Sequence, residues 1–134
     1  MRLEISSDVI DQIVAESAAA PDREVCGLLF GTADRVSSVQ RCSNVASDPA
    51  RSFEIDPSQL IAAHKAARAG GPAIVGCYHS HPNGGATPSA RDASAATPDG
   101  SIWVIAAGGA VAIWRAVENG ACEGRFDPVD FCRG

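Results

Sequence analysis

Two apolar runs, at residues 24–31 and 73–79, constrain the fold of this chain most strongly. The first is a near-continuous apolar stretch of the kind typical of a strand buried on both faces, and the second reads as a central strand. Helical periodicity lies between and before them, because apolar residues recur at helical spacing from Val9 to Ala18 and again from Leu60 to Ala67. The order is not a strict βαβ alternation. We therefore expect an α/β domain with a mixed sheet and helices packed on it.

Turn and cap residues place the remaining elements. Ser6 or Ser7 is expected to cap the first helix, which ends at Pro21-Asp22. The second helix opens at residues 56–58 and stops at Gly70-Gly71. Further strands are expected at 2–5 (a short edge strand), 35–42, 53–55, 102–106, 110–117 and 122–126, with polar loops at 44–51 and 82–88 and a short helix at 89–96. Residues 127–134 contain no motif that predicts an element.

Size and composition exclude several classes of protein. The chain has 134 residues, which fits a single domain over 1–134. Its net charge of −5 and the lack of a Lys/Arg cluster argue against nucleic-acid binding. The five cysteines are odd in number and widely spaced, so they predict neither a disulfide framework nor a thiolate metal cage. Reduced cysteines, no apolar signal core and no membrane-length apolar run predict a cytoplasmic protein.

The segment His79-Ser80-His81-Pro82 carries the strongest chemical signal. Residues two apart on a strand point to the same face, so both imidazoles can reach one ion, and Pro82 ends the strand. Ser89 and Asp92 share a face of the following helix. If that helix folds back onto the strand end, Asp92 supplies a third ligand. Two imidazoles and one carboxylate are a usual protein set for a catalytic zinc, which keeps a fourth position open for water.

Simpler interpretations compete with the metal site. Ser89-x-x-Asp92 is also a helix-capping pattern, and taken alone it favours the cap. A lone His-x-His is a weak signal. The joint pattern of His-x-His-Pro, a six-residue gap and Ser-x-x-Asp favours the metal site. There the Ser89 hydroxyl would donate a hydrogen bond to a developing oxyanion.

A zinc hydrolase also needs a carboxylate that accepts a proton from water without binding the metal. Glu24 is the candidate, because it stands at the mouth of a buried strand, although from composition alone a solvated strand end is the better interpretation. Glu16, Glu54 and Asp99 compete without a positional argument, and His64 is interpreted as a surface residue.

These residues resemble the JAMM or MPN+ (Mov34/MPN/PAD-1-like) metalloprotease family, in its small prokaryotic type. The family pattern is a glutamate on an early strand, then His-x-His-Pro, six residues and Ser-x-x-Asp. It maps without a gap onto Glu24, His79, His81, Pro82, Ser89 and Asp92. The similarity extends from about Leu3 to Trp114 and includes Asn44 and the segment 53–57. It implies an MPN-like fold and a zinc-dependent peptidase or isopeptidase.

The resemblance also implies roles and a substrate. One Zn²⁺ would be held by His79, His81 and Asp92, with Glu24 as the acid/base and Ser89 steadying the tetrahedral intermediate. The expected substrate is a ubiquitin-like or sulfur-carrier protein ending in Gly-Gly, whose tail lacks Cβ atoms and fits a narrow groove or pairs with a sheet edge. The main alternative is a non-catalytic MPN scaffold, which the complete ligand set argues against. A nucleobase deaminase is disfavoured because the Pro-Cys-x-x-Cys of that class is missing.

Overall fold

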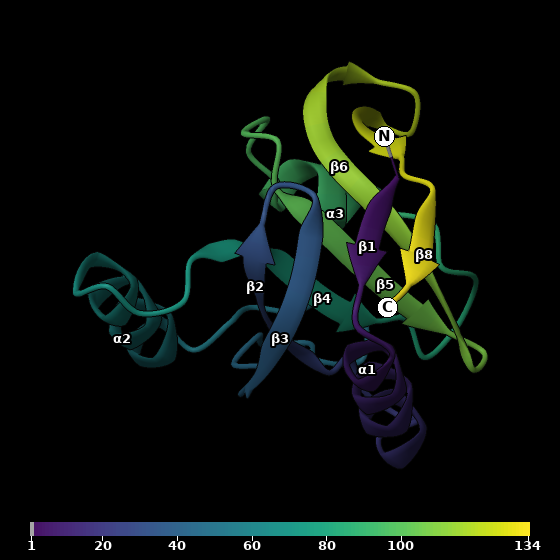
Figure 1. Cartoon of the computed structure of the whole chain (residues 1–134). Helices are drawn as coiled ribbons and strands as arrows, with labels where there is room; N and C mark the ends of the chain where they lie inside the picture. Colours follow the sequence, from purple (N-terminus) through teal and green to yellow (C-terminus); the bar gives the residue numbers. More distant parts are fainter. Residues whose placement is uncertain (1) are drawn as a thin grey trace.

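The structure, a computed structural model, describes residues 2–134, and in this part of the chain eight strands form one curled sheet (Figure 1). Three helices pack on the sheet: α1 (Ser7–Ala19), α2 (Pro57–Arg68) and α3 (Ala90–Ala95). The strands are β1 (Leu3–Ile5), β2 (Cys26–Thr32), β3 (Arg35–Cys42), β4 (Ile74–Ser80), β5 (Ile102–Ala107), β6 (Ala110–Gly120), β7 (Gly124–Pro128) and β8 (Phe131–Arg133).

The strand order is β7-β6-β5-β4-β2-β3-β1-β8. The pairs β4-β5, β1-β3 and β1-β8 are parallel, and the other neighbouring pairs are antiparallel. The predicted class, an α/β domain with a mixed sheet flanked by helices, is confirmed. The apolar runs that indicated buried strands become β2 and β4, which lie side by side in the middle of the sheet.

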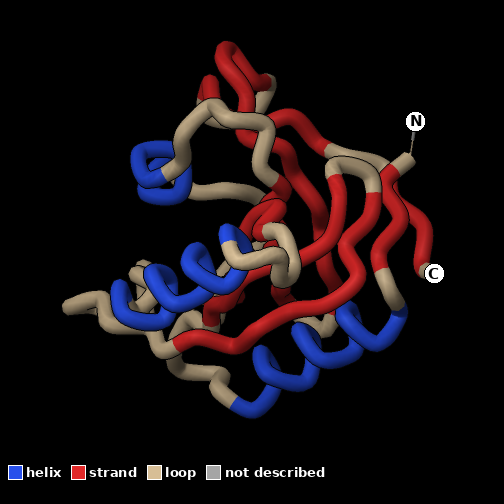
Figure 2. Tube along the Cα trace, turned by 60° about the vertical axis from the view of Figure 1, so that its left-hand side comes forward, coloured by secondary structure: helices blue, strands red, loops and turns tan. Residues whose placement is uncertain are grey.

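The helices cover opposite faces of the sheet. Leu29, Tyr78 and Val104 belong to the apolar cluster under α1, whereas Leu28 and Phe30 pack with Ala63 of α2. Residues of α3 pack with Trp103 and Phe126, at the β5-β7 end of the sheet. Figure 2 shows strands passing between α1 and α2. Because neighbours such as Leu28 and Leu29 point to opposite faces, both faces of the central strands are buried.

Two glycines let the central strands approach closely. A Cβ on Gly76 would clash with the backbone of Ile102 on β5, and a Cβ on Gly27 would clash with the Tyr78 ring on β4. Tyr78 is fully buried, and its hydroxyl donates a 2.7 Å hydrogen bond to Glu16 of α1. This bond joins α1 to the strand that carries the histidines.

Several element predictions were wrong or incomplete. The segment 53–55 is not a strand, since Ile55 makes only an isolated bridge to Asn44. The last predicted strand, 122–126, is shifted to Gly124–Pro128, and Cys122 makes only a single bridge. Strand β1 is not an edge strand, because β8, in the segment without a recognisable motif, pairs with it in parallel. These errors share a cause, since pairing with a partner far away in the sequence decides each of them.

The other predicted helices and strands are present, with ends that differ from the prediction by up to three residues. Asp56 caps α2 by accepting a hydrogen bond from the Ser58 amide. Ser6 occupies the N-cap position of α1, but its side chain makes no capping bond. All five cysteines are free thiols. Within the described part of the chain, every helix is too short or too polar to span a membrane.

Candidate metal centre and active site

The ends of β4 and α3 meet where the sequence predicted a metal site. His79 is on β4, His81 follows the strand directly, and Asp92 lies in the first turn of α3. The His79 Nε2 atom lies 3.1 Å from His81 Nε2 and 3.1 Å from Asp92 Oδ1. Asp92 Oδ2 lies 3.2 Å from His81 Nε2. The helix therefore folds back as expected, and it brings the three predicted ligands together.

These separations fit a metal ion. Ligand atoms about 2.0–2.1 Å from a tetrahedral zinc are about 3.3 Å apart, close to the 3.1–3.2 Å observed. Potential ligand atoms of all three residues lie within 4.8 Å of one another. His79 and Asp92 are buried, and His81 is half-buried. The group thus has the spacing and the donor types of a metal site.

Ser89 and Asp92 also form the capping box predicted as the alternative. The Asp92 amide donates to Ser89 Oγ over 3.1 Å, and the Ser89 amide donates to Asp92 Oδ2 over 2.9 Å. The cap is thus confirmed, but it does not exclude the metal site. It fixes the Asp92 side chain so that Oδ1 faces His79, and it leaves the Ser89 O–H free to donate elsewhere.

The electrostatics of the three residues reflect burial and mutual contact. Burial lowers the pKa of His79 below its ordinary value, which favours the neutral imidazole that a metal needs. Burial also acts on Asp92, but the hydrogen bonds from His79 and His81 outweigh it and hold the pKa of Asp92 well below its usual range. For His81, burial is outweighed by the contacts with Asp92 and the Gly85 carbonyl, so its pKa is raised. The carboxylate is therefore ionised and ready to bind a cation.

Glu24 lies beside this cluster. It precedes β2, and the antiparallel register that pairs Cys26 with His79 places it opposite His81. Ser80 secures that register, because its Oγ accepts a hydrogen bond from the Val25 amide and its own amide donates to the Val25 carbonyl. Glu24, at the start of the buried strand β2, therefore lines the candidate site.

The Glu24 carboxyl group is unusually placed for a charge. Its residue is 5% exposed, and Oε1 has no hydrogen-bond partner among the described residues. Burial raises the pKa of Glu24 to about 7, with smaller opposing effects of His81 and Asp92. A carboxyl group poised near neutral pH can both accept and release a proton there. The competing interpretation of Glu24 as a solvated strand end is therefore wrong.

Asn44 is a structural residue whose role the sequence did not reveal. Its amide nitrogen donates to the carbonyls of Glu24 and Ser52, at 2.9 and 3.0 Å, and its Oδ1 accepts from the amides of Ala46 and Glu54, at 3.0 and 3.1 Å. One side chain therefore ties the loop 43–56 to the backbone of Glu24. The family resemblance included Asn44, but its position in the sequence did not indicate which groups it contacts.

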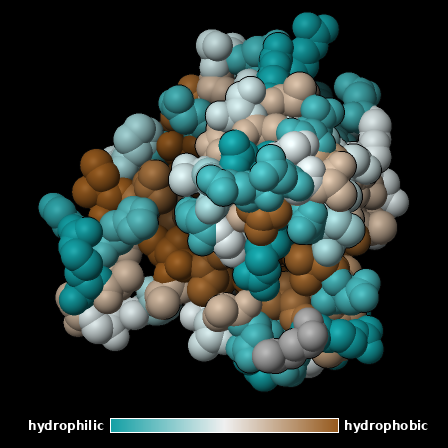
Figure 3. All heavy atoms as spheres, turned by 90° about the horizontal axis from the view of Figure 1, so that it is seen from above, coloured by the Kyte–Doolittle hydropathy of each residue, from teal (hydrophilic) through white to brown (hydrophobic). Residues whose placement is uncertain are grey.

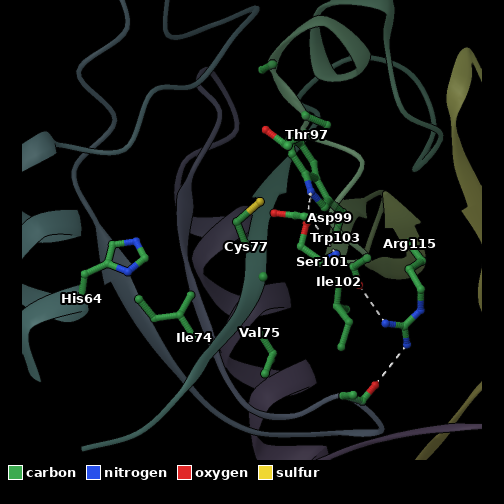
Figure 4. Close-up of a pocket in the computed structure, with 15 residues that line it drawn as sticks. His64, Ile74, Val75, Cys77, Thr97, Asp99, Ser101, Ile102, Trp103 and Arg115 are labelled. Carbon is green, nitrogen blue, oxygen red and sulfur yellow. Dashed lines mark hydrogen bonds between the residues drawn. The ribbon is translucent and has the colours of Figure 1, made fainter. Parts of the chain in front are cut away.

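A hollow of about 520 Å³ lies on the same face of the sheet, where residues of α2, β4 and β5 line it. Figure 3 shows hydrophobic residues gathered between α2, at the left, and the body of the molecule. In Figure 4, Cys77 and Asp99 project into the space between His64 and Trp103. Trp103 also contacts the His79 ring, with centroids 5.7 Å apart. Trp103 therefore links the hollow to the cluster, although the three predicted ligands are not among the residues that line the hollow.

The other carboxylates considered as proton acceptors lie outside the cluster or accept hydrogen bonds from other residues. Glu16 accepts hydrogen bonds from Tyr78 and Gln12 on the α1 face of the sheet. Glu54 and Asp99 are exposed. His64 is exposed, as predicted, and lines the outer side of the hollow.

Comparison with known proteins gives a consistent result. The sequence profile described as prokaryotic homologs of the JAB domain matches residues 6–119. A desampylase of Haloferax volcanii is 36% identical over 110 residues, 78% of this chain and 79% of that protein. A Thermus thermophilus protein, named a probable TtuB-protein conjugate cleaving protease, is 32% identical over 67% of this chain and 60% of its own length.

Solved structures share the fold of this chain. A JAB1/MPN domain protein of Archaeoglobus fulgidus superposes with a TM-score of 0.62 at 18% identity, over 98% of both chains. This likeness supports the architecture, and the profile match spans most of the chain. The resemblance stated from the sequence is confirmed: the chain belongs to the prokaryotic homologs of the JAB domain.

Proposed function

We propose that this protein is a zinc-dependent peptidase or isopeptidase that hydrolyses the bond after the C-terminal Gly-Gly of a ubiquitin-like or sulfur-carrier protein. The observation that carries the proposal is the convergence of His79, His81 and Asp92 beside the unpartnered carboxyl group of Glu24. The relatives named for desampylation and for cleaving protein conjugates support the reaction class.

Zinc is the ion proposed, because two imidazoles, one carboxylate and an open position are its usual catalytic set. When bound, zinc supplies a Lewis acid that polarises the scissile carbonyl and makes a water molecule more acidic. The chain would hold the ion through Nε2 of His79, Nε2 of His81 and Oδ1 of Asp92. Oδ2 of Asp92 remains engaged by the Ser89 amide, which keeps the carboxylate oriented.

Glu24 is proposed as the acid/base. Its Oε1 has no hydrogen-bond partner among residues 2–134, so it can accept the proton of an attacking water and later deliver it to the leaving amine. Its pKa of about 7 in the metal-free protein suits both roles near neutral pH. A nearby cation would lower that pKa and favour the ionised form that starts the cycle.

Ser89 is proposed to stabilise the oxyanion. Its oxygen already accepts the Asp92 amide as the helix cap, so the hydroxyl hydrogen is left to donate. A hydrogen bond that strengthens as negative charge develops on the carbonyl oxygen lowers the barrier. The helix cap would thus also serve the reaction.

The hollow is proposed to hold the substrate tail. Its volume of about 520 Å³ and its wall of Ile74, Cys77 and Trp103 suit an extended peptide segment. A diglycine end has no Cβ atoms, so it can lie extended against this wall.

The test uses purified protein, metal analysis and ubiquitin-like proteins extended past Gly-Gly. We expect about one zinc per chain, cleavage after Gly-Gly, and loss of cleavage with a chelator. Glu24→Gln should keep zinc but lose about 10²–10⁴-fold in kcat. Glu54→Gln, an exposed carboxylate of the same type, is the matched control.

Two outcomes would contradict the proposal. If Glu24→Gln cleaves as fast as the wild type, the acid/base assignment is wrong. If His79→Ala with His81→Ala still binds one equivalent of zinc, the metal site lies elsewhere.

A further inference from the structure

His79 lacks a contact that metal-binding histidines ordinarily have. Such a histidine usually donates its second ring N–H to a carboxylate or a carbonyl, which fixes the ring orientation. The side chain of His79 is 0% exposed and its Nε2 faces Asp92 and His81. Its Nδ1 has no hydrogen-bond partner among residues 2–134. Some other interaction must therefore hold the ring.

Aromatic rings surround His79 instead. Phe53 stacks on the imidazole with centroids 4.4 Å apart and an interplanar angle of 21°. Trp103 meets the imidazole edge-on at 5.7 Å and 89°, and it also contacts Phe53 at 5.9 Å. Trp103 is itself supported by Phe126, at 5.1 Å. The ring of His79 is thus enclosed by a packed set of aromatic planes.

The loop 43–56 holds Phe53 firmly in place. Phe53 lies between Ser52 and Glu54, and the backbone of both neighbours is hydrogen-bonded to the Asn44 side chain. The segment has no strand pairing of its own beyond the bridge of Asn44 and Ile55. Phe53 was predicted to lie on a strand, and its position in this loop is what lets it reach across to β4.

The stacked geometry also suits a bound cation. The face of a phenyl ring carries negative potential, so it attracts a group that gains positive charge. An imidazole bound to a divalent ion becomes more positive than a free one. In a buried site this attraction is weakly screened. Stacking on Phe53 would therefore favour the metal-bound state of His79 over the metal-free state.

We propose that Phe53, supported by Trp103, is a positioning residue that orients His79 for metal binding in place of the hydrogen bond its Nδ1 lacks. The inference rests on the proposed function in that His79 is taken as a metal ligand. Phe53 touches neither the ion nor the scissile bond, so it acts through His79. Its effect is expected on metal affinity first and on turnover second.

The experiment measures the Zn²⁺ dissociation constant by competition with a chromophoric chelator. Phe53→Ala should weaken zinc binding about 10- to 100-fold, the usual loss when a partner of a metal ligand is removed. Phe53→Leu keeps apolar volume without a ring and should weaken binding similarly, whereas Phe53→Tyr should bind within about threefold of the wild type. Phe131 lies on β8 and, like Phe53, is half-buried. Phe131→Ala is therefore the matched control and should leave zinc affinity unchanged.

Two further readouts separate positioning from general loss of structure. Thermal unfolding of the metal-free variants identifies any that do not fold. Among the variants that fold, the zinc affinities of Phe53→Leu and Phe53→Tyr show whether an aromatic ring at this position is needed. The visible spectrum of the Co²⁺-loaded proteins reports ligand geometry, and we expect Phe53→Leu to alter its d–d bands while Phe131→Ala does not.

The outcomes are distinct. Wild-type zinc affinity in Phe53→Ala, or in Phe53→Leu, would overturn the role of the stacked ring. A loss in Phe131→Ala as large as in Phe53→Ala would show a general effect of lost stability and would also overturn it. If His79→Ala binds zinc as well as the wild type, the proposed metal site fails instead, whatever the Phe53 variants do.

Discussion

Replacing Glu24 by glutamine should change how the stability of the metal-free protein depends on pH. The folded state raises the pKa of Glu24 from 4.5 to about 7, because burial disfavours the charged form. The folded protein therefore holds a proton that the unfolded chain releases between these values. Stability is lost as pH rises from about 4.5 to about 7 and then stays level, the reverse of an ordinary paired carboxylate.

The magnitude follows from the size of the shift. A difference of 7 − 4.5 = 2.5 units, at about 1.4 kcal/mol per unit, corresponds to about 3 kcal/mol. Glutamine has a similar shape and no charge, so the stability of Glu24→Gln does not fall for this reason as the pH rises. Relative to the wild type, the variant should gain about 1.4 kcal/mol per pH unit between about pH 5 and 7, and level off near 3 kcal/mol.

Urea unfolding in the presence of a chelator, at pH 5, 6, 7 and 8, measures this difference. Asp92 stays ionised over this range, and His79 and His81 are present in both proteins, so the difference between the two curves reports Glu24 together with its effect on His81. Glu54→Gln removes an exposed carboxylate and should follow the wild type at every pH. Added zinc should reduce the gap, because a cation stabilises the ionised Glu24. Parallel curves for Glu24→Gln and the wild type over this range would refute the reasoning.

Three further predictions concern the surroundings of the site. Asn44→Ala removes four hydrogen bonds that secure the loop 43–56 and the Glu24 backbone. It should lower the unfolding free energy, measured by denaturation, by about 2–4 kcal/mol. It should also lower kcat in cleavage assays. Tyr78→Phe removes a hydrogen bond from buried Glu16 and should cost about 1–3 kcal/mol in thermal unfolding, with zinc affinity unchanged. Gly76→Ala forces a Cβ against the β5 backbone and should lower the unfolding free energy, measured by urea denaturation, by about 1–3 kcal/mol.

Zinc itself should stabilise the protein. At a free concentration about 100-fold above the dissociation constant, binding to the folded state adds about 2.7 kcal/mol. A chelator should therefore lower the midpoint of thermal unfolding by several degrees in the wild type. The same chelator should have no effect on His79→Ala with His81→Ala. A shift of equal size in that variant would place the metal elsewhere.

Features that depend on the local order of residues could be predicted before the fold was known. The continuous apolar runs predicted β2 and β4, because a strand covered on both faces needs no polar side. The two-residue spacing of His79 and His81 and the three-residue spacing of Ser89 and Asp92 predicted which side chains share a face, because strand and helix periods are fixed by backbone geometry. The same spacing carried the family resemblance.

The tertiary structure decided what depends on contacts between distant segments. Strand β8 forms in a segment without a recognisable motif, because its partner β1 lies more than 120 residues earlier. Phe53 stacks on His79 and Asn44 fastens Glu24, although no periodicity links either pair. The loop 43–56 hydrogen-bonds to the Glu24 backbone, and the burial that raises the pKa of Glu24 exists only in the folded chain. Local spacing fixes where a side chain points, but only the folded chain fixes what it meets and how little water reaches it.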